Sequence, residues 1–569
     1  MVRCKDAEKF RTSSVLRVHT RSVFWLTQQL TVLGQPVNPG LQFRRSEKMG
    51  VFISIPMTIL LTFLMLGSGF CQDHAQTIVW GRGGDSISLD PAQAQDGESL
   101  KVTMHIFETL VRFRTGTFEI EPWLARSWTT SENGTAWTFT LREDLKFSDG
   151  SPCDADAVVF SYMRQLDREH PYFTEGIWAQ STFAGVKSVE ALDSLTVRIT
   201  LEKPYAPFLS NLAMIAAAPI VCPNAVKRHG SEFGKNPVGS GPLAFIEWIP
   251  GERIVLQRNP HYWGPVPEFE TLIFRSIINN RNRLNALKAG VLHGMDGVDY
   301  EIQRQVMRDE SLRLTTGLPM NVGYLAMNTQ RPPFDNVLVR RAVNHAINKQ
   351  SLVKLFYQGI AVIAKGPLPP GMLGYNPDQP DYEFDPQQAR DLMKQAGYGA
   401  GVTVRLWTPP VPRPAIPEPM KIAMSIQSSL AAIGIRLEIV SPATWREYLN
   451  QVNNGEHDAC LLSWMGDNGD PDNFLYTLLD MDNAVRPKAL NRAFFRDQEV
   501  HAILVQAQQE LDPKARDTLY RKALLRIHDQ APWVPLAHAQ TLMAMRSDLF
   551  GCEMTAFNLP YLANASRRR

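Results

Sequence analysis

The chain has 569 residues, more than one hydrophobic core usually organises, so two or more lobes are expected. Its composition, 44% hydrophobic and 20% charged, is that of a globular protein and excludes a disordered or low-complexity chain. A formal net charge of +2 excludes the strongly basic field that a nucleic-acid-binding protein needs.

The first predicted element is an uncharged apolar run from Val51 to Phe70. Pro56 interrupts the run, small residues end it, polar residues follow it, and basic residues lie just before it. These features favour a secretory signal peptide over a membrane span. We therefore expect a signal peptide over residues 49–71, cleaved after Cys71, with an uncleaved membrane anchor as the alternative.

Cys71 ends the sequence LGSGFC and could carry a lipid, but the bulky Phe70 before it argues against a lipid anchor. Residues 1–48 show no helical or strand periodicity, and we interpret them as a misassigned or disordered N-terminal extension. Residues 1–75 contain nine Lys/Arg and four Asp/Glu, which leaves residues 76–569 with a net charge of −3. We expect a mildly acidic exported protein that binds no nucleic acid.

Four cysteines lie beyond the leader, without any CxxC spacing, which favours isolated buried thiols or at most one or two disulfides. The sequence has no GxSxG, HExxH, Walker or CxxCH motif, so we predict no catalytic residue, no metal site and no cofactor. The acidic loop at residues 467–473 lacks the closing glutamate of a calcium-binding EF-hand.

The first half of the mature chain is rich in strand patterns. TIVW at residues 77–80 predicts a strand, and the loop after it has glycines but no GxGxxG. Asn133-Gly134, between two β-like runs, predicts a hairpin, and Asp154 is expected to cap a helix. Further strand patterns follow at residues 192–201 and, as a hairpin, at 242–264.

Helical and strand patterns alternate in the second half. Residues 334–357 predict one amphipathic helix capped by Asp335, and a second helix is expected from Asp385 to a stop at Gly397. Strand patterns occur at 402–407, 435–440, 457–464 and 533–545, with helical patterns at 420–433 and at 497–529, the latter interrupted near Pro513. This alternation predicts an open α/β lobe.

Seven longer motifs then occur in one order. They are the run from Leu124 to Arg142, FSDGSPCDADAVVFSY at 147–162, NPVGSGP at 236–242, NPHYWG at 259–264, NVGYLAMN at 321–328, PFDNVLVRRAVNHAINK at 333–349 and GDNGDPDNF at 466–474. Together they resemble the extracytoplasmic solute-binding proteins of ABC importers, family 5, which include peptide and nickel binders. The resemblance covers the chain from Gln76 to about its last thirty residues.

The resemblance implies a fold class of α/β, a two-lobed periplasmic-binding-protein clamshell (type II-like) with an extra subdomain in lobe I. It implies lobe I over residues 76–276, lobe II over 277–532 and a return segment over 533–569. The ligand would lie between the lobes, and hinge closure would bury it. The expected protein is a monomer in the periplasm without catalytic activity, which binds a short peptide and delivers it to an inner-membrane ABC permease with cytoplasmic ATPase subunits.

The resemblance also implies two charged ligand contacts. The first aspartate of the GDNGDPDN loop pairs with the ligand ammonium in the family and matches Asp467, and the arginine after VRLW pairs with the ligand carboxylate and matches Arg413. The two charges of a dipeptide lie about 7 Å apart, so a fixed carboxylate and a fixed guanidinium would select length. Arginine suits a carboxylate because its planar fork donates two parallel hydrogen bonds.

Other interpretations of these residues stay open. Asp467 could brace its own turn, and Arg413 could be a surface charge in a proline-rich loop. The dipeptide binders carry an aromatic residue two positions after the arginine, where this chain has Ala415, which leaves room for a different ligand. Trp464, Gly466 and Tyr324 are further candidates for the ligand cleft, with core positions as the alternative for Trp464 and Tyr324.

Three other functions compete with peptide transport. The same scaffold could bind glutathione, haem or another zwitterionic solute. A closed clamshell could instead dock on a chemoreceptor as a sensory partner. A secreted hydrolase would need a nucleophile and a base that the sequence does not display.

Overall fold

The computed structural model describes residues 76–568. The predicted extension at 1–48, the signal peptide at 49–71 and the lipid attachment at Cys71 lie outside the described residues. Within residues 76–568, none of the helices combines the length and the apolar character that a membrane crossing requires.

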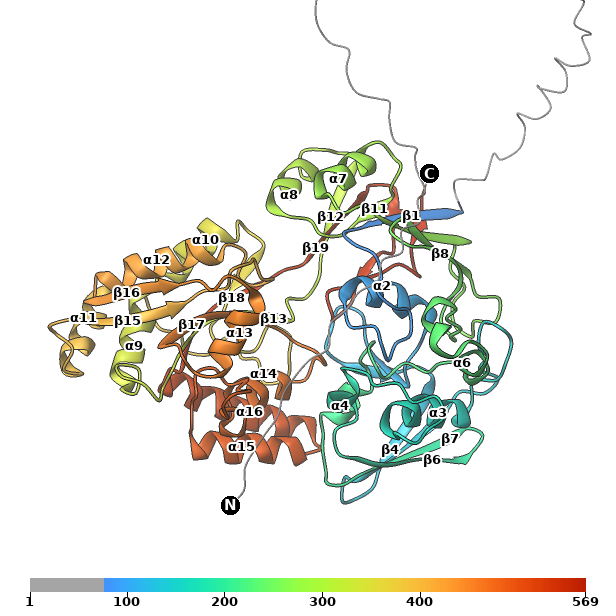
Figure 1. Cartoon of the computed structure of the whole chain (residues 1–569), viewed down its shortest axis with the longest axis horizontal. Coiled ribbons are helices and arrows are strands. Elements are labelled where there is room, and N and C mark those ends of the chain that lie inside the picture. Colours follow the sequence, from blue (N-terminus) through green and yellow to red (C-terminus); the bar gives the residue numbers. More distant parts are fainter. Residues whose placement is uncertain (1–75, 569) are drawn as a thin grey trace, which may run out of the picture. The chain divides into compact units, whose positions relative to one another are not determined.

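The described chain forms a mixed α/β protein of two lobes, each built on one large sheet (Figure 1). Lobe I contains a seven-stranded sheet in which β1 lies between two parallel neighbours. Its strands, in sheet order, are β12 (Leu312–Thr316), β19 (Leu542–Arg546), β11 (Gly294–Met295), β1 (Thr77–Arg82), β10 (Thr271–Ser276), β9 (Arg253–Arg258) and β8 (Leu243–Ile249). The hairpin expected at 242–264 is confirmed as β8 and β9.

The second large sheet belongs to lobe II. Its strands, in sheet order, are β14 (Ala361–Ile363), β18 (Trp533–Ala539), β13 (Asn321–Met327), β17 (Ala459–Met465), β15 (Val402–Trp407) and β16 (Ile435–Val440). Strand β13 is buried along its whole length because both faces are covered. Leu325 and Met327 face one core of the lobe, and Val322, Tyr324 and Ala326 face the other.

The chain passes from lobe I to lobe II and later returns. Strand pairing places both passages later in the sequence than the resemblance implied. Strands β11 and β12 follow Ser276 in sequence but still pair in the lobe I sheet. Strand β18 begins at Trp533 but pairs with β13 and β14 of the lobe II sheet. By sheet membership, the chain therefore passes to lobe II within residues 317–320 and returns within residues 540–541.

A separate antiparallel sheet forms the extra subdomain of lobe I. It contains β4 (Ala125–Thr130), β5 (Ala136–Leu141), β7 (Thr196–Leu201) and β6 (Val186–Asp193), and α3 packs against β6 and β7. The Asn133-Gly134 hairpin is confirmed as the turn between β4 and β5, where Gly134 has a positive φ of 69°. The pattern at 192–201 covers the end of β6, a turn and β7, rather than one strand.

Three pairs of short strands complete the described sheets: β2 (Val111–Phe113) with β3 (Ile120–Pro122), β20 (Leu549–Phe550) with β23 (Ser566–Arg567), and β21 (Glu553–Met554) with β22 (Pro560–Tyr561). The helices between Gly97 and Val306 are α2 (Gly97–Ile106), α3 (Ala155–Leu166), α4 (Ala179–Thr182), α5 (Phe208–Asn211), α6 (Pro223–His229), the 3₁₀-helix η1 (Gly230–Lys235), α7 (Asn280–Lys288) and α8 (Tyr300–Val306). Those of lobe II are α9 (Val337–Ala346), α10 (Lys349–Phe356), α11 (Pro386–Gln395), α12 (Pro419–Ala431), α13 (Trp445–Asn453), α14 (Asp472–Leu479), the 3₁₀-helix η2 (Met481–Asn483), α15 (Gln498–Gln509) and α16 (Pro513–Gln530).

Most predicted helix caps are confirmed. The side chains of Asp154 and Asp385 accept hydrogen bonds from backbone amides in the first turns of α3 and α11, and Gly397 follows α11 with a φ of 86°. The single helix expected over 334–357 was wrong, because the chain ends α9 at Ala346 and begins α10 with Asn348 as a new cap. The cap of α9 is also Asn336 rather than Asp335, because the Asn336 side chain accepts a hydrogen bond from the Leu338 amide in the first turn.

The four cysteines beyond the leader are free and buried, at positions 153, 222, 460 and 552. The interpretation as isolated buried thiols is therefore confirmed, and the alternative of one or two disulfides is wrong for these residues.

Candidate ligand-binding site

The two predicted charge-bearing residues lie on loops that leave neighbouring strands of lobe II. Strand β15 pairs in parallel with β17, so both strands end at the same edge of the sheet. The loop after β15 carries Arg413, and the loop after β17 carries Asp467. The Ala415 amide donates to the Ser463 hydroxyl of β17 at 3.1 Å, which fixes one loop against the strand that leads to the other. The carboxyl ends of parallel strands are the usual ligand edge of an α/β sheet.

Asp467 is braced by one neighbouring side chain. Asn473 accepts a hydrogen bond from the Asp467 amide at 3.0 Å and donates one to the Asp467 carboxylate at 3.1 Å. Burial raises the pKa of Asp467 to about 6, against which the Asn473 hydrogen bond acts. Among residues 76–568 the carboxylate has no cationic partner. Asp467 therefore braces its own turn, as the alternative interpretation predicted. The hydrogen bonds that do so leave its negative charge uncompensated.

The other acids of the same loop have protein partners. Arg516 holds Asp470 with two hydrogen bonds, of 3.0 and 2.9 Å, and both side chains are buried. Asp472 accepts hydrogen bonds from the Gln508 side chain at 2.9 Å and from the Tyr205 hydroxyl at 3.0 Å. Both acids are thus committed to holding the loop. Asp467 is the carboxylate of this loop that a ligand cation can still pair with.

Arg413 lies in a similar position on the other loop. Its guanidinium carbon lies 4.3 Å from the ring centroid of Trp445, and burial lowers its pKa. Its Nε atom is buried without a hydrogen-bond partner in the described part of the chain. The Arg413 backbone pairs with Ile416, which closes a tight turn over residues 413–416. A ligand carboxylate would give this guanidinium the anion that the described residues do not supply.

Trp464 and Gly466 support the Asp467 loop. Trp464 is half-buried at the end of β17, and its indole N–H donates to the same Asn473 oxygen at 3.0 Å. A Cβ atom at Gly466 would lie 2.6 Å from the Phe474 ring and 2.9 Å from the Met320 side chain. Gly466 is therefore needed for close packing, and neither residue has an established ligand contact.

Tyr324 and Ala415 lie in the interior of lobe II. Tyr324 is 1% exposed and stacks on Trp533 with 3.6 Å between ring centroids. It therefore occupies a core position, which was the alternative to a place in the ligand cleft. Ala415 is fully buried, and its carbonyl accepts a hydrogen bond from Tyr357. The position at which dipeptide binders carry an aromatic residue is therefore occupied here by a fully packed alanine.

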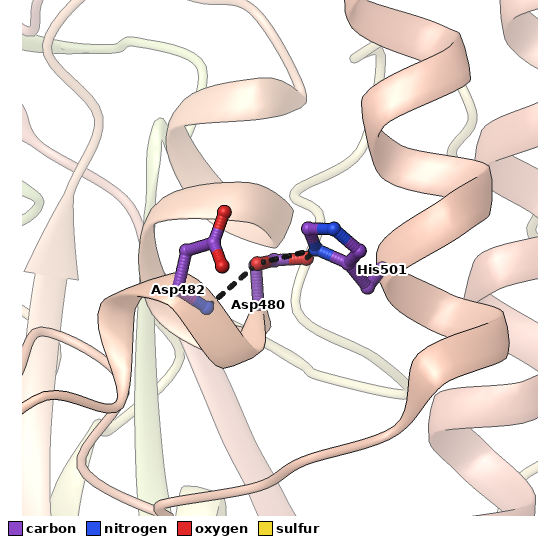
Figure 2. A group of neighbouring side chains, drawn as sticks. All are labelled: Asp480, Asp482 and His501. Atoms are coloured by element: carbon purple, nitrogen blue, oxygen red, sulfur yellow. Dashed lines mark hydrogen bonds and ion pairs between the residues drawn. The ribbon is translucent and has the colours of Figure 1, made fainter.

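A second group of polar side chains, Asp480, Asp482 and His501, lies between the end of α14 and α15 (Figure 2). Possible ligand atoms of Asp480, Asp482 and His501 lie within 4.8 Å of one another. Asp480 is fully buried, its carboxylate contacts His501 Nδ1 at 3.0 and 3.1 Å, and it accepts the Asp482 amide as the cap of η2. Asp482 accepts a hydrogen bond from Tyr476. These partners explain the group as a helix cap whose carboxylate is hydrogen-bonded to a histidine.

Sequence reasoning missed two supporting residues. Asn473 belongs to the GDNGDPDNF motif, but its spacing does not show that the side chain turns back to Asp467. Trp445 begins α13, more than thirty residues after Arg413, and only the fold brings its ring under the guanidinium. For the stacking of Arg413 on Trp445, the sequence offered no signal beyond the proline-rich composition of the Arg413 loop.

Comparison with known proteins identifies this architecture. The family model for bacterial extracellular solute-binding proteins, family 5 Middle, matches residues 119–485. The dipeptide-binding protein of Escherichia coli K12 is 32% identical over 510 residues, which cover 87% of this chain and 95% of that protein. The heme-binding protein A of Haemophilus influenzae is 34% identical over 472 residues, 80% of this chain and 85% of that protein.

A solved structure agrees with the sequence relatives. The periplasmic binding protein of Helicobacter pylori, solved with the peptide STSA, is 34% identical. It superposes with a TM-score of 0.69 over 88% of this chain and all of that chain.

Proposed function

Because the chain belongs to the bacterial extracellular solute-binding proteins of family 5, we propose that it binds a dipeptide or another short peptide in the periplasm. The lobes hold the peptide, and the protein delivers it as a monomer to an inner-membrane ABC permease driven by cytoplasmic ATPase subunits. The chain acts by binding and release and performs no catalytic step. A cleaved signal peptide at residues 49–71 accounts for export.

One observation carries this proposal. Within residues 76–568, Asp467 is a desolvated carboxylate without a cationic partner and Arg413 is a partly desolvated guanidinium without an anionic partner, and their loops leave adjacent parallel strands. A zwitterion supplies both missing charges at once. Ligand binding is then favourable in part because it removes two electrostatic costs that the free protein bears.

The same chemistry separates peptides from the other ligands of this scaffold. Haem has carboxylates but no ammonium, so it would leave Asp467 uncompensated. Glutathione has an α-ammonium and two carboxylates, and it is the alternative ligand that keeps both contacts. A chemoreceptor role would use the same closed, liganded form.

The test measures which end of the peptide each residue recognises. Isothermal titration calorimetry compares Ala-Ala with its N-acetylated form and its C-terminal amide. For the wild type, each blocked peptide should bind about tenfold to a thousandfold more weakly. Asp467→Asn should bind Ala-Ala weakly and become insensitive to acetylation, while it stays sensitive to amidation. Arg413→Gln should show the opposite pattern.

Two exposed residues of lobe II provide matched controls. Asp391→Asn and Arg405→Gln remove the same charges at sites outside the two loops, and both should bind Ala-Ala like the wild type. The proposal fails if Asp467→Asn and Arg413→Gln bind peptides with unchanged affinity. It also fails if glutathione and haem bind while dipeptides and tripeptides do not.

A further inference from the structure

Lobe I contains a cavity of about 90 Å³ that the ligand contacts above do not use. Its walls come from the end of α2, the β2 region, the segment at 213–219 and the C-terminal segment at 555–561. Most of the lining is apolar, including Phe107, Phe113, Trp123, Ile215 and Phe557. A concave apolar site with few polar groups is the usual form of a small-ligand pocket.

The cavity lies beside the loop that carries Asp467. A Cβ atom at Gly469 would be 3.0 Å from the Phe113 ring, so this lobe II loop touches one wall of the cavity. The Phe557 ring lies 5.6 Å from Phe113 and packs against the cores of both lobes. A ligand whose ammonium pairs with Asp467 is therefore held next to this part of lobe I.

The charged groups of the lining are compensated. Glu108 is 3% exposed, and both of its oxygens accept the Trp263 indole N–H at 3.1 Å. Burial raises its pKa to about 8, so this carboxyl is mainly neutral near pH 7. Arg112 pairs with Glu121 at 2.7 Å and stacks over Trp123 at 3.3 Å. The cavity thus offers no unpaired charge to a ligand from within the described residues.

We propose that this cavity receives one apolar side chain, of about leucine size, from the peptide that lobe II holds by its charged ends. The inference rests on the proposed function and adds a side-chain preference to it. The volume indicates the size, because an apolar cavity of about 150 Å³ holds a benzene ring, and this cavity, at about 90 Å³, is smaller. A charged side chain is rejected because it would lose its hydration without gaining a partner.

The test compares dipeptides that differ in one side chain. Calorimetry with Leu-Ala, Ala-Leu, Asp-Ala, Ala-Asp and Ala-Ala covers both positions, and Asp is similar to Leu in shape but charged. One of the two Leu peptides should bind the wild type about tenfold to a hundredfold more tightly than Ala-Ala. The Asp peptide of the same position should bind no better than Ala-Ala.

Two variants at one half-buried wall residue then locate the preference. Ile215→Trp fills the cavity, and it should remove the advantage of the Leu peptide over Ala-Ala. Ile215→Ala enlarges the cavity and should shift the preference towards the corresponding Phe peptide. Ile177→Trp changes an exposed isoleucine of the same lobe and should change nothing. Thermal melting checks that each variant is folded.

The possible failures are distinguishable. If the wild type binds Ala-Ala, and Leu and Asp peptides bind equally well, the cavity assignment is overturned and the proposed function stands. A Leu preference that persists in folded Ile215→Trp overturns the assignment in the same way. If the wild type binds none of the five dipeptides, both the assignment and dipeptide binding are overturned, and peptide binding as a whole falls if tripeptides do not bind either.

Discussion

The Tyr205 hydroxyl of lobe I donates a hydrogen bond to the Asp472 carboxylate of lobe II at 3.0 Å. A second contact lies beside it, because the Asn468 side chain donates to the Asn211 side-chain oxygen at 2.6 Å. Both lobe II partners belong to the segment that also carries Asp467. The predicted ammonium-binding loop is therefore hydrogen-bonded directly to the opposite lobe, and we expect ligand contact at this loop to be coupled to contact between the lobes.

Tyr205→Phe tests this coupling. The change removes one interlobe hydrogen bond, worth about 0.5 to 1.5 kcal/mol, and keeps the ring. We expect peptide affinity to fall about threefold to tenfold, mainly through faster dissociation, if this contact helps to hold the lobes together around the ligand. Calorimetry and stopped-flow fluorescence measure both quantities. Unchanged affinity and unchanged dissociation would show that the contact does not contribute to closure.

Asp467→Asn is expected to stabilise the ligand-free protein. The pKa of Asp467 rises from 3.8 to about 6 on folding, so the folded state holds this proton more tightly than the unfolded state. This contribution to stability is complete below about pH 3.8 and is lost as the pH rises through about 6. At neutral pH the free energy of unfolding of the variant, measured in urea titrations, should be about 1 to 2 kcal/mol higher than that of the wild type. Near pH 4 the two proteins should differ little, and a difference independent of pH would contradict this origin.

Peptide binding should weaken in acid through the same residue. Protonated Asp467 cannot pair with an ammonium, so dipeptide affinity should fall about tenfold from neutral pH to about pH 5. The α-amino and α-carboxyl groups of a peptide hardly titrate in this window. Calorimetry at the two pH values measures the change. The Asp467→Asn variant is the control. If its affinity falls with pH as that of the wild type does, a group other than Asp467 causes the pH dependence.

Arg516 should be essential for the stability of the loop. Arg516→Leu leaves the buried Asp470 carboxylate without its cation and should lower the free energy of unfolding by about 3 to 5 kcal/mol. The double variant Arg516→Leu/Asp470→Asn removes both charges and should recover part of this loss. Chemical unfolding of the wild type, both single variants and the double variant gives the coupling between the two sites. If the two single variants lower the free energy of unfolding by amounts that simply add in the double variant, the pair does not interact as the distances indicate.

Local patterns in the sequence predicted local structure well. Asp154, Asp385 and the Asn133-Gly134 turn each act on backbone amides a few residues away, so their roles follow from spacing alone. The break between α9 and α10 escaped prediction because the apolar periodicity continues across Ile347, while Asn348 begins a new helix. Burial of Tyr324 was undecided for a similar reason, since β13 is covered on both faces and its pattern does not alternate.

The sequence by itself determined the α/β class, the family and the two charge-bearing candidates, because ordered motifs and charged residues can be read along the chain. Only the tertiary structure decided which acids of the GDNGDPDN loop are already paired, since Arg516, Gln508 and Tyr205 reach it from distant segments. The assignment of β11, β12 and β18 to their sheets was likewise decided by long-range pairing. Such contacts depend on which strands and helices meet, and residue spacing along one chain does not encode that directly.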